Sequence, residues 1–105
     1  LGQGELAMST ARKAMDVFET AHDHERFTFA QFEYAKAEVL LGKIDEGLAS
    51  LEQVLAVLTE EEPRDLEFIV DVECRIAPVY RIKGRVQEAD EIERRLASVR
   101  EELGA

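Results

Sequence analysis

Cysteine, proline and long apolar runs are scarce in this sequence. It has one cysteine, Cys74, and two prolines in 105 residues. A single thiol excludes an internal disulfide framework, and no apolar run approaches the roughly 18 residues that a membrane-spanning helix needs. A signal-peptide pattern is also missing. We therefore expect a cytoplasmic protein.

Basic residues are in the minority. The chain has 13 Lys and Arg against 23 Asp and Glu, which gives a formal net charge of −10 at pH 7. The acidic excess extends over both halves of the chain and forms no tail. Because nucleic acids and anionic lipid headgroups are bound by clustered Lys and Arg, we expect neither a nucleic-acid partner nor a membrane partner.

Alternation with period two is missing too, and apolar residues instead recur at spacings of three and four. The sequence therefore predicts an all-α protein with five helices. They cover about residues 5–21, 27–41, 44–58 and 63–83, followed by a helix that carries the apolar residues from Ala89 to Leu103. The expected apolar stripe of the first helix consists of Ala7, Ala11, Ala14, Phe18 and Ala21.

One segment recurs along the chain. Each copy has a glycine, a small residue five positions later and then a helical apolar stripe. The glycine and small residue are Gly2 and Ala7, Gly42 and Gly47, and Gly84 and Ala89. A period of about 40 residues predicts stacked helical hairpins rather than one closed globule.

Several residues mark the expected helix boundaries. Asp23 is placed to cap the second helix, while Gly42 and Gly84 permit tight turns between antiparallel helices. Pro63 is expected at the first position of the fourth helix. Pro78 lies inside that helix and removes one backbone hydrogen bond, so we expect a bend there rather than a functional hinge.

Two copies of a finer pattern can be aligned. One reads Ile76-Ala77, Tyr80, Gly84, Glu88-Ala89 and Leu96, and the other reads Tyr34-Ala35, Gly42, Glu46-Gly47, Leu51 and Val54. This pattern resembles the tetratricopeptide repeat family, especially its longer variant of about 42 residues, similar to the repeats of kinesin light chains. The chain departs from the family at Glu38, where an aromatic is usual, and at Gly47, where alanine is usual.

The resemblance implies a right-handed superhelical stack of antiparallel helix pairs. Residues 1–105 then form a single domain, with a half repeat over 1–26 and full repeats over 27–62 and 63–105. Because the chain opens without an initiator Met and its first helix lacks a pair, we expect an excerpt of a longer protein. The unpaired first helix should expose an apolar side, where the array continues or where the protein self-associates as a homo-oligomer.

For function, the resemblance implies a binding scaffold without catalytic activity. In the family, the first helix of each pair lines a concave groove. The partner-binding residues expected here are Phe29, Phe32, Lys36, Val39, Asp71, Cys74 and Arg81, with Pro78 beside them. Phe29 and Phe32 would anchor a peptide while Lys36 or Arg81 pairs with its acidic groups. Alternatively, the two phenylalanines simply pack against a neighbouring helix.

Other activities have little support in the sequence. The absence of asparagine, and the apolar Phe32 and Cys74 at clamp positions, disfavour the carboxylate clamp by which some family members hold chaperone tails. Glu19 and His22 have the spacing of a di-iron ligand pair, but a second such pair is missing. Cys74 has no nucleophilic signature, and no glycine-rich loop could cradle a phosphate. We expect no metal, no cofactor and no enzymatic activity.

Two hypotheses about function follow. In the first, the chain is a protein-interaction module that binds a peptide or a partner domain, or associates with itself. In the second, it is the sensor domain of a signalling or transcription regulator and binds a small ligand or a signalling peptide in its curve.

Overall fold

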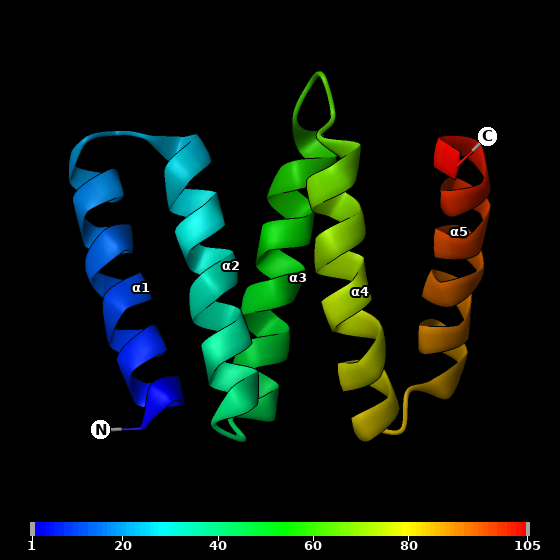
Figure 1. Ribbon diagram of the computed structural model, residues 1–105, viewed down its shortest axis with the longest axis horizontal. Helices are drawn as coiled ribbons and strands as arrows, with labels where there is room; N and C mark the ends of the chain where they lie inside the picture. The colour runs from blue at the N-terminus through cyan, green and yellow to red at the C-terminus, as the bar shows by residue number, and fades with distance from the viewer. Residues whose placement is uncertain (1, 105) are drawn as a thin grey trace.

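The computed structural model describes residues 2–104, and within them the fold is all-α, as the periodicity predicts. Five helices follow one another in space in the order of the chain, and each packs against its neighbours in sequence (Figure 1). They are α1 (Gln3–Thr20), α2 (His24–Leu40), α3 (Ile44–Glu60), α4 (Leu66–Ile82) and α5 (Val86–Gly104). Short connections make successive helices antiparallel.

The repeated glycines end helices in the same way. At Gly42 the backbone is left-handed (φ 81°). Its N–H donates to the carbonyl of Val39 at 3.0 Å, and the N–H of Lys43 donates to that of Glu38 at 2.8 Å. This pair of bonds is the Schellman arrangement, which satisfies the last carbonyls of a helix. Gly84 (φ 78°) repeats it at the end of α4, so the prediction that both glycines serve tight turns is confirmed.

The turn between α1 and α2 has the same bonds without a glycine. His22 takes the left-handed conformation (φ 56°), its N–H donates to the carbonyl of Glu19, and the N–H of Asp23 donates to that of Phe18. A side chain in this region is strained by about 1 kcal/mol or more. The sequence predicted only a polar break here, because this turn lacks the glycine that marks the other two turns.

Side-chain caps set the starts of α2 and α4. The Asp23 carboxylate accepts a hydrogen bond from the N–H of Arg26 at 3.1 Å, which confirms the predicted cap. Asp65 does the same for the N–H of Phe68 at 3.1 Å. The expectation that α4 starts at Pro63 is wrong. Pro63 lies in the α3–α4 loop, and the helix begins at Leu66, where the Asp65 cap satisfies one of the free N–H groups of the first turn.

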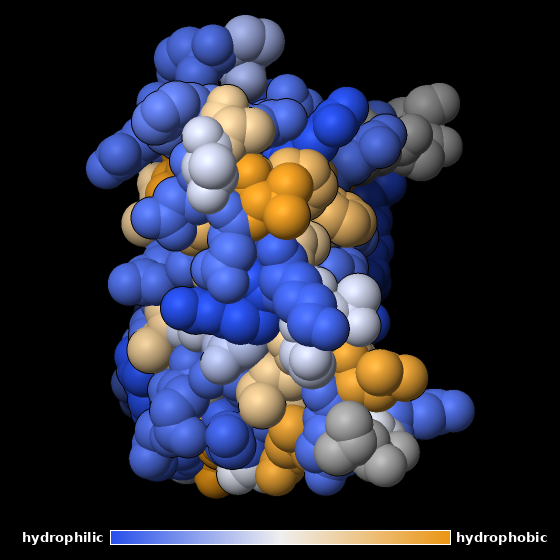
Figure 2. Space-filling model, turned by 90° about the vertical axis from the view of Figure 1, so that its left-hand side faces the viewer, coloured by the Kyte–Doolittle hydropathy of each residue, from blue (hydrophilic) through white to orange (hydrophobic). Residues whose placement is uncertain are grey.

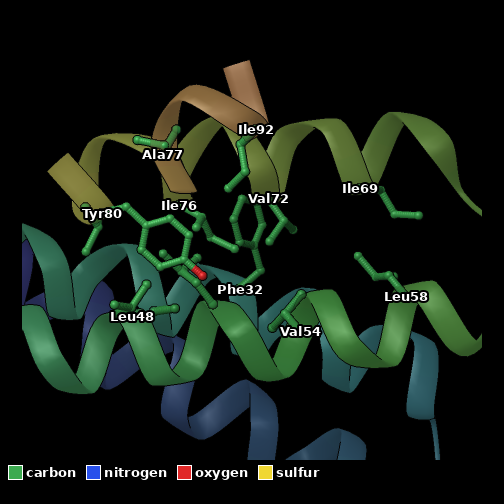
Figure 3. Close-up of a cluster of buried hydrophobic side chains, with 14 of the residues drawn as sticks. Phe32, Leu48, Val54, Leu58, Ile69, Val72, Ile76, Ala77, Tyr80 and Ile92 are labelled. Carbon is green, nitrogen blue, oxygen red and sulfur yellow. The ribbon is translucent and has the colours of Figure 1, made fainter. Parts of the chain in front are cut away.

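The hydrophobic core lies between α2, α3, α4 and α5. Leu51 and Val54 of α3 meet Val72 and Ile76 of α4 at its centre, and all four are almost completely buried. Figure 3 shows this cluster between the two helices, with Phe32 of α2 pointing into it. Among the described residues, α1 contributes none to this cluster and packs mainly on α2.

The buried face of α1 differs from the predicted stripe. Ala11 is buried as expected, but Ala7 and Ala21 are exposed, and the other buried residues are Gly4 and Met15. The inward face is therefore rotated relative to the alanine stripe. Gly4 contributes because a β-carbon there would come within 2.7 Å of a methyl group of Leu41, so the bare backbone lets α1 approach the end of α2.

Pro78 lies on the exposed side of α4, which continues through it from Leu66 to Ile82. Its missing N–H therefore does not end the helix. The bend expected around it stays a prediction.

Candidate protein-interaction surface

A groove of about 1000 Å³ runs between the end of α1, the start of α2, the end of α3, the α3–α4 loop and the start of α4. Its apolar lining comes from Phe18, Phe29, Leu58, Pro63 and Phe68. Its charged lining comes from Glu25, Arg26, Glu61, Glu62, Arg64 and Asp65. An apolar floor with a charged rim is the composition expected of a surface that binds another polypeptide.

Three phenylalanine rings are in contact at this groove, and two of them, Phe29 and Phe68, line it. The Phe68 ring lies 6.0 Å from the Phe29 ring and 5.5 Å from the Phe32 ring, centroid to centroid, and both pairs are tilted. Such spacings are typical of favourable aromatic pairs. Phe32 is only 5% exposed, whereas Phe29 is 56% exposed and lines the groove. The burial of Phe32 fits the alternative that this ring packs against a neighbouring helix.

Local structure fixes where Phe29 and Phe68 stand. Phe29 and Phe32 are three residues apart on α2, so they lie on neighbouring positions of one helix face. Phe68 is in the first turn of α4, and its own N–H is the group that Asp65 caps. The cap that starts α4 therefore also fixes the backbone from which the Phe68 ring meets Phe29 and Phe32.

The charged rim is more acidic than basic. Four carboxylates line the groove against two guanidinium groups. Arg26 lies 3.5 Å from Asp23, the residue that caps its own helix. Arg64, in the α3–α4 loop, forms no ion pair with any side chain in the part of the chain that the structure describes. A ligand of this groove thus meets a net negative rim.

The two other α2 residues of the expected site have partners within the protein. The Lys36 ammonium lies 2.8 Å from a Glu33 carboxylate oxygen and 4.6 Å from the centre of the Phe32 ring. Val39 is half-buried against Gly47 of α3, where a β-carbon would come within 2.6 Å of one of its methyl groups.

The expected residues on α4 lie elsewhere, toward α5. Cys74 is half-buried, and its sulfur accepts a hydrogen bond from Arg100 at 3.5 Å. Arg81 makes 2.7 Å contacts with both Asp90 and Glu93. The hydrogen bond to Glu93, followed by the one to Asp90, raises the pKa of Arg81 above its usual value. Asp71 is exposed. Of the seven residues expected to bind a partner, only Phe29 lines the groove.

Sequence reasoning missed Phe18, Arg64 and Phe68. Phe68 is an aromatic residue in the first turn of α4, and that was the signal available in the sequence. The contribution of the loop arginine depends on how the α3–α4 loop folds back beside α2, which periodicity does not reveal.

Glu19 and His22, the residues with di-iron spacing, line a shallow hollow of about 830 Å³ at the α1–α2 turn. Within residues 2–104, no three or more His, Cys, Asp or Glu side chains are grouped so that they could hold a metal ion.

Among the same residues, no helix has both the length and the apolar character needed to cross a membrane. Comparisons of the chain with protein-family models, with curated proteins and with solved structures give no match.

Proposed function

We propose that this chain is a protein-interaction module that binds a peptide segment of a partner in the groove between α2 and α4. The observation that carries the proposal is the Phe29 ring, which is 56% exposed although it stands against Phe68 at the edge of the core. Covering the exposed part of one such ring stabilises a complex by about 1–2 kcal/mol. Aromatic anchors of this kind dominate the energy of many interfaces.

The rim indicates the charge of the ligand. Lys36 and Arg81, which the sequence suggested as contacts for acidic groups, already have carboxylate partners within the protein. The groove itself has more carboxylates than guanidinium groups, and the whole chain has a net charge of −10. Such a field attracts cations and speeds their association. The ligand we propose is a peptide with an apolar anchor residue flanked by Lys or Arg.

A peptide selection tests this proposal. Random peptides displayed on phage are selected on the immobilised chain, and a selected peptide is then titrated in solution by fluorescence anisotropy. We expect apolar residues next to Lys or Arg to be enriched. The substitution Phe29→Ala should lower the affinity for the selected peptide by about tenfold or more, since it removes the anchor. Raising the salt concentration should also lower the affinity, because it screens the charges.

The matched control is Ile82→Ala, which truncates a comparably exposed apolar side chain on α4 outside the groove. It should leave affinity within about twofold. Circular dichroism should show unchanged helicity in both variants. Phe32 is unsuitable for this experiment, because its ring belongs to the core. Enrichment of acidic peptides, or equal binding by Phe29→Ala and the native chain, would contradict the proposal.

A further inference from the structure

α1, α3 and α5 share one face that can be compared position by position. Aligning their small residues Ala7, Gly47 and Ala89 brings the rest of the face into register. The face consists of Ala7, Thr10, Ala14 and Val17 in α1, of Gly47, Ser50, Val54 and Val57 in α3, and of Ala89, Ile92, Leu96 and Val99 in α5. We call it the hairpin face, because in α3 and α5 it meets the preceding helix.

In α3 and α5 most of the hairpin face is covered, although Val57 at the end of α3 stays 40% exposed. Gly47 lies against Val39 and the backbone of Ala35 in α2, and the Ser50 hydroxyl donates to a Glu38 carboxylate oxygen at 2.8 Å. In α5, Ala89 is 0% exposed, and α4 is the helix that packs against α5. The small residue in each case lets the preceding helix approach closely.

In α1 the same face is largely exposed to solvent. Val17 is 62% exposed, Ala7 and Thr10 are exposed and Ala14 is half-buried. The neighbouring side of α1, which carries Gly4, Ala11 and Met15, is the side that packs on α2. Figure 2 looks at this end of the molecule and shows hydrophobic patches among hydrophilic side chains. α1 thus has two apolar faces, of which the described residues cover one.

The far end of the stack is different. The side of α5 that faces away from α4 has exposed charged residues, among them Glu91, Arg94 and Glu101. A polar outer face is what ends a helical stack in water. Head-to-tail stacking of two copies would press the apolar face of α1 onto these charges and strip their water. The partner of α1 is therefore not α5 of a second copy.

A polar pair lies beside the hairpin face in each of the two covered cases. It indicates the charge of a helix that would cover the hairpin face of α1. Between α2 and α3, the Gln31 amide donates to the Gln53 amide oxygen at 2.9 Å. Between α4 and α5, Arg95 lies 2.9 Å from a Glu73 carboxylate oxygen. That oxygen has no aligned hydrogen-bond donor, so the second contact is ionic rather than a hydrogen bond.

The two pairs occupy equivalent places. Gln31 and Glu73 each precede a buried alanine, Ala35 or Ala77, by four residues. Gln53 and Arg95 each follow the small residue of the hairpin face by six. In α1 the residue at that place is Lys13, which is exposed. It forms no ion pair with any side chain among residues 2–104.

We propose that the hairpin face of α1 is a docking site for an antiparallel amphipathic helix of a partner protein. That helix carries Glu or Asp opposite Lys13 and an alanine four residues later, as α4 does with Glu73 and Ala77. Alanine lets the two backbones approach over Ala7, and the carboxylate pairs with the ammonium group of Lys13. This surface is separate from the groove at Phe29.

The probe for this site is a fluorescein-labelled synthetic peptide with the sequence of residues 65–83, which has the required carboxylate and alanine. It is titrated into the full chain and followed by anisotropy. We expect saturable binding that falls about tenfold when Lys13→Glu is introduced into the protein, or Glu73→Lys into the peptide. Combining the two substitutions should restore affinity, because the charges are then exchanged.

The matched control is Arg12→Glu, which makes the same change of charge one residue away, on the side of α1 where Arg12 pairs with Asp16. It should change affinity by less than about twofold. A lack of saturation up to about 1 mM peptide would overturn the proposal. So would binding that responds to Arg95→Glu but not to Lys13→Glu, since the peptide would then be replacing α4 on α5.

Light scattering of the protein alone tests whether a second copy of the chain, rather than a partner helix, covers the hairpin face of α1. A concentration-dependent dimer that Val17→Glu abolishes would place a second copy on this face and overturn the proposal. A monomer over the same concentrations is the expected result.

Discussion

At the scale of single residues, Tyr80 shows how burial changes the chemistry of one group. It is buried in α4, its hydroxyl donates to a Glu52 carboxylate oxygen of α3 at 2.9 Å, and the Arg85 guanidinium lies 4.2 Å from its ring centre. Burial, helped by the hydrogen bond to Glu52, raises the pKa of Tyr80 to about 12. The phenol is therefore held neutral between α3 and α4.

This shift in pKa makes stability depend on pH. A tyrosine in the unfolded chain has a pKa of about 10, so unfolding above that pH releases a proton that the folded state retains. The stabilisation is complete below pH 10 and is lost as the pH rises toward 12. We expect the free energy of unfolding, measured with urea, to fall across that interval.

Tyr80→Phe is the control for the pH series. It should cost about 1 kcal/mol at pH 7, because the hydrogen bond to Glu52 is lost. It should also flatten the decline above pH 10. Equal slopes for the native chain and the variant would show that other groups cause the decline.

At the scale of elements, the α1–α2, α2–α3 and α4–α5 turns share one backbone geometry. Two of them have glycine at the left-handed position, and one has histidine. Gly42 and Gly84 hold the left-handed position without strain, and His22 holds it with a side chain. The bonds that close each helix are the same. The strain at His22 therefore lowers the stability of the α1–α2 turn. The other two turns have glycine at this position and are not strained in this way.

We expect His22→Gly to raise the free energy of unfolding by up to about 1 kcal/mol, because relief of the left-handed strain exceeds the added entropy of the unfolded chain. The opposite substitution, Gly42→Ala, should lower it by about 1–2 kcal/mol, although a β-carbon at Gly42 meets no neighbour within 4 Å. Urea unfolding of both variants measures the two effects. Destabilisation by His22→Gly would indicate that the imidazole has a structural role.

Elements are also where sequence reasoning succeeded best. Five helices, the Asp23 cap and both glycine turns depend on a few adjacent residues, so periodicity and turn chemistry were enough to predict them. The start of α4 was misjudged because Pro63 and Asp65 both suit a helix start, and the aspartate cap prevailed. The buried face of α1 was misjudged because its buried residues Gly4 and Met15 lie beside the alanine stripe, and composition does not say which side meets α2.

At the scale of the whole molecule, the stack is unequal along its length. α3 and α4 lie between neighbours on both sides and supply the centre of the core (Figures 1 and 3). α1 packs on one neighbour and buries only small or flexible residues, namely Gly4, Ala11 and Met15. Segments with few buried apolar contacts open at a lower free energy than the core.

We therefore expect hydrogen exchange to divide the molecule. Amides of α1 should exchange through local opening, while those of Leu51, Val54, Val72 and Ile76 should exchange only through global unfolding. Exchange measured by NMR as a function of denaturant gives the opening free energy of each amide. If α1 opened only together with the core, its single covered face would be enough for full cooperativity, contrary to this expectation.

The candidate site depended on contacts between distant parts of the chain. Phe29 was identified from the sequence, but its partner Phe68 and the loop residue Arg64 were not, since they approach it only through the α3–α4 connection. Phe32 looked like a second anchor because it follows Phe29 by three residues. The contact with Phe68 and with the core between α3 and α4 buries the Phe32 ring, while the Phe29 ring stays at the surface.

The sequence by itself determined that the chain forms helices and where the glycine turns between them fall, because helix periodicity and turn chemistry act over a few neighbouring residues. Only the tertiary structure decided which apolar faces are covered. Burial depends on which helices meet, so the same hairpin face is largely covered in α3 and α5 and largely exposed in α1.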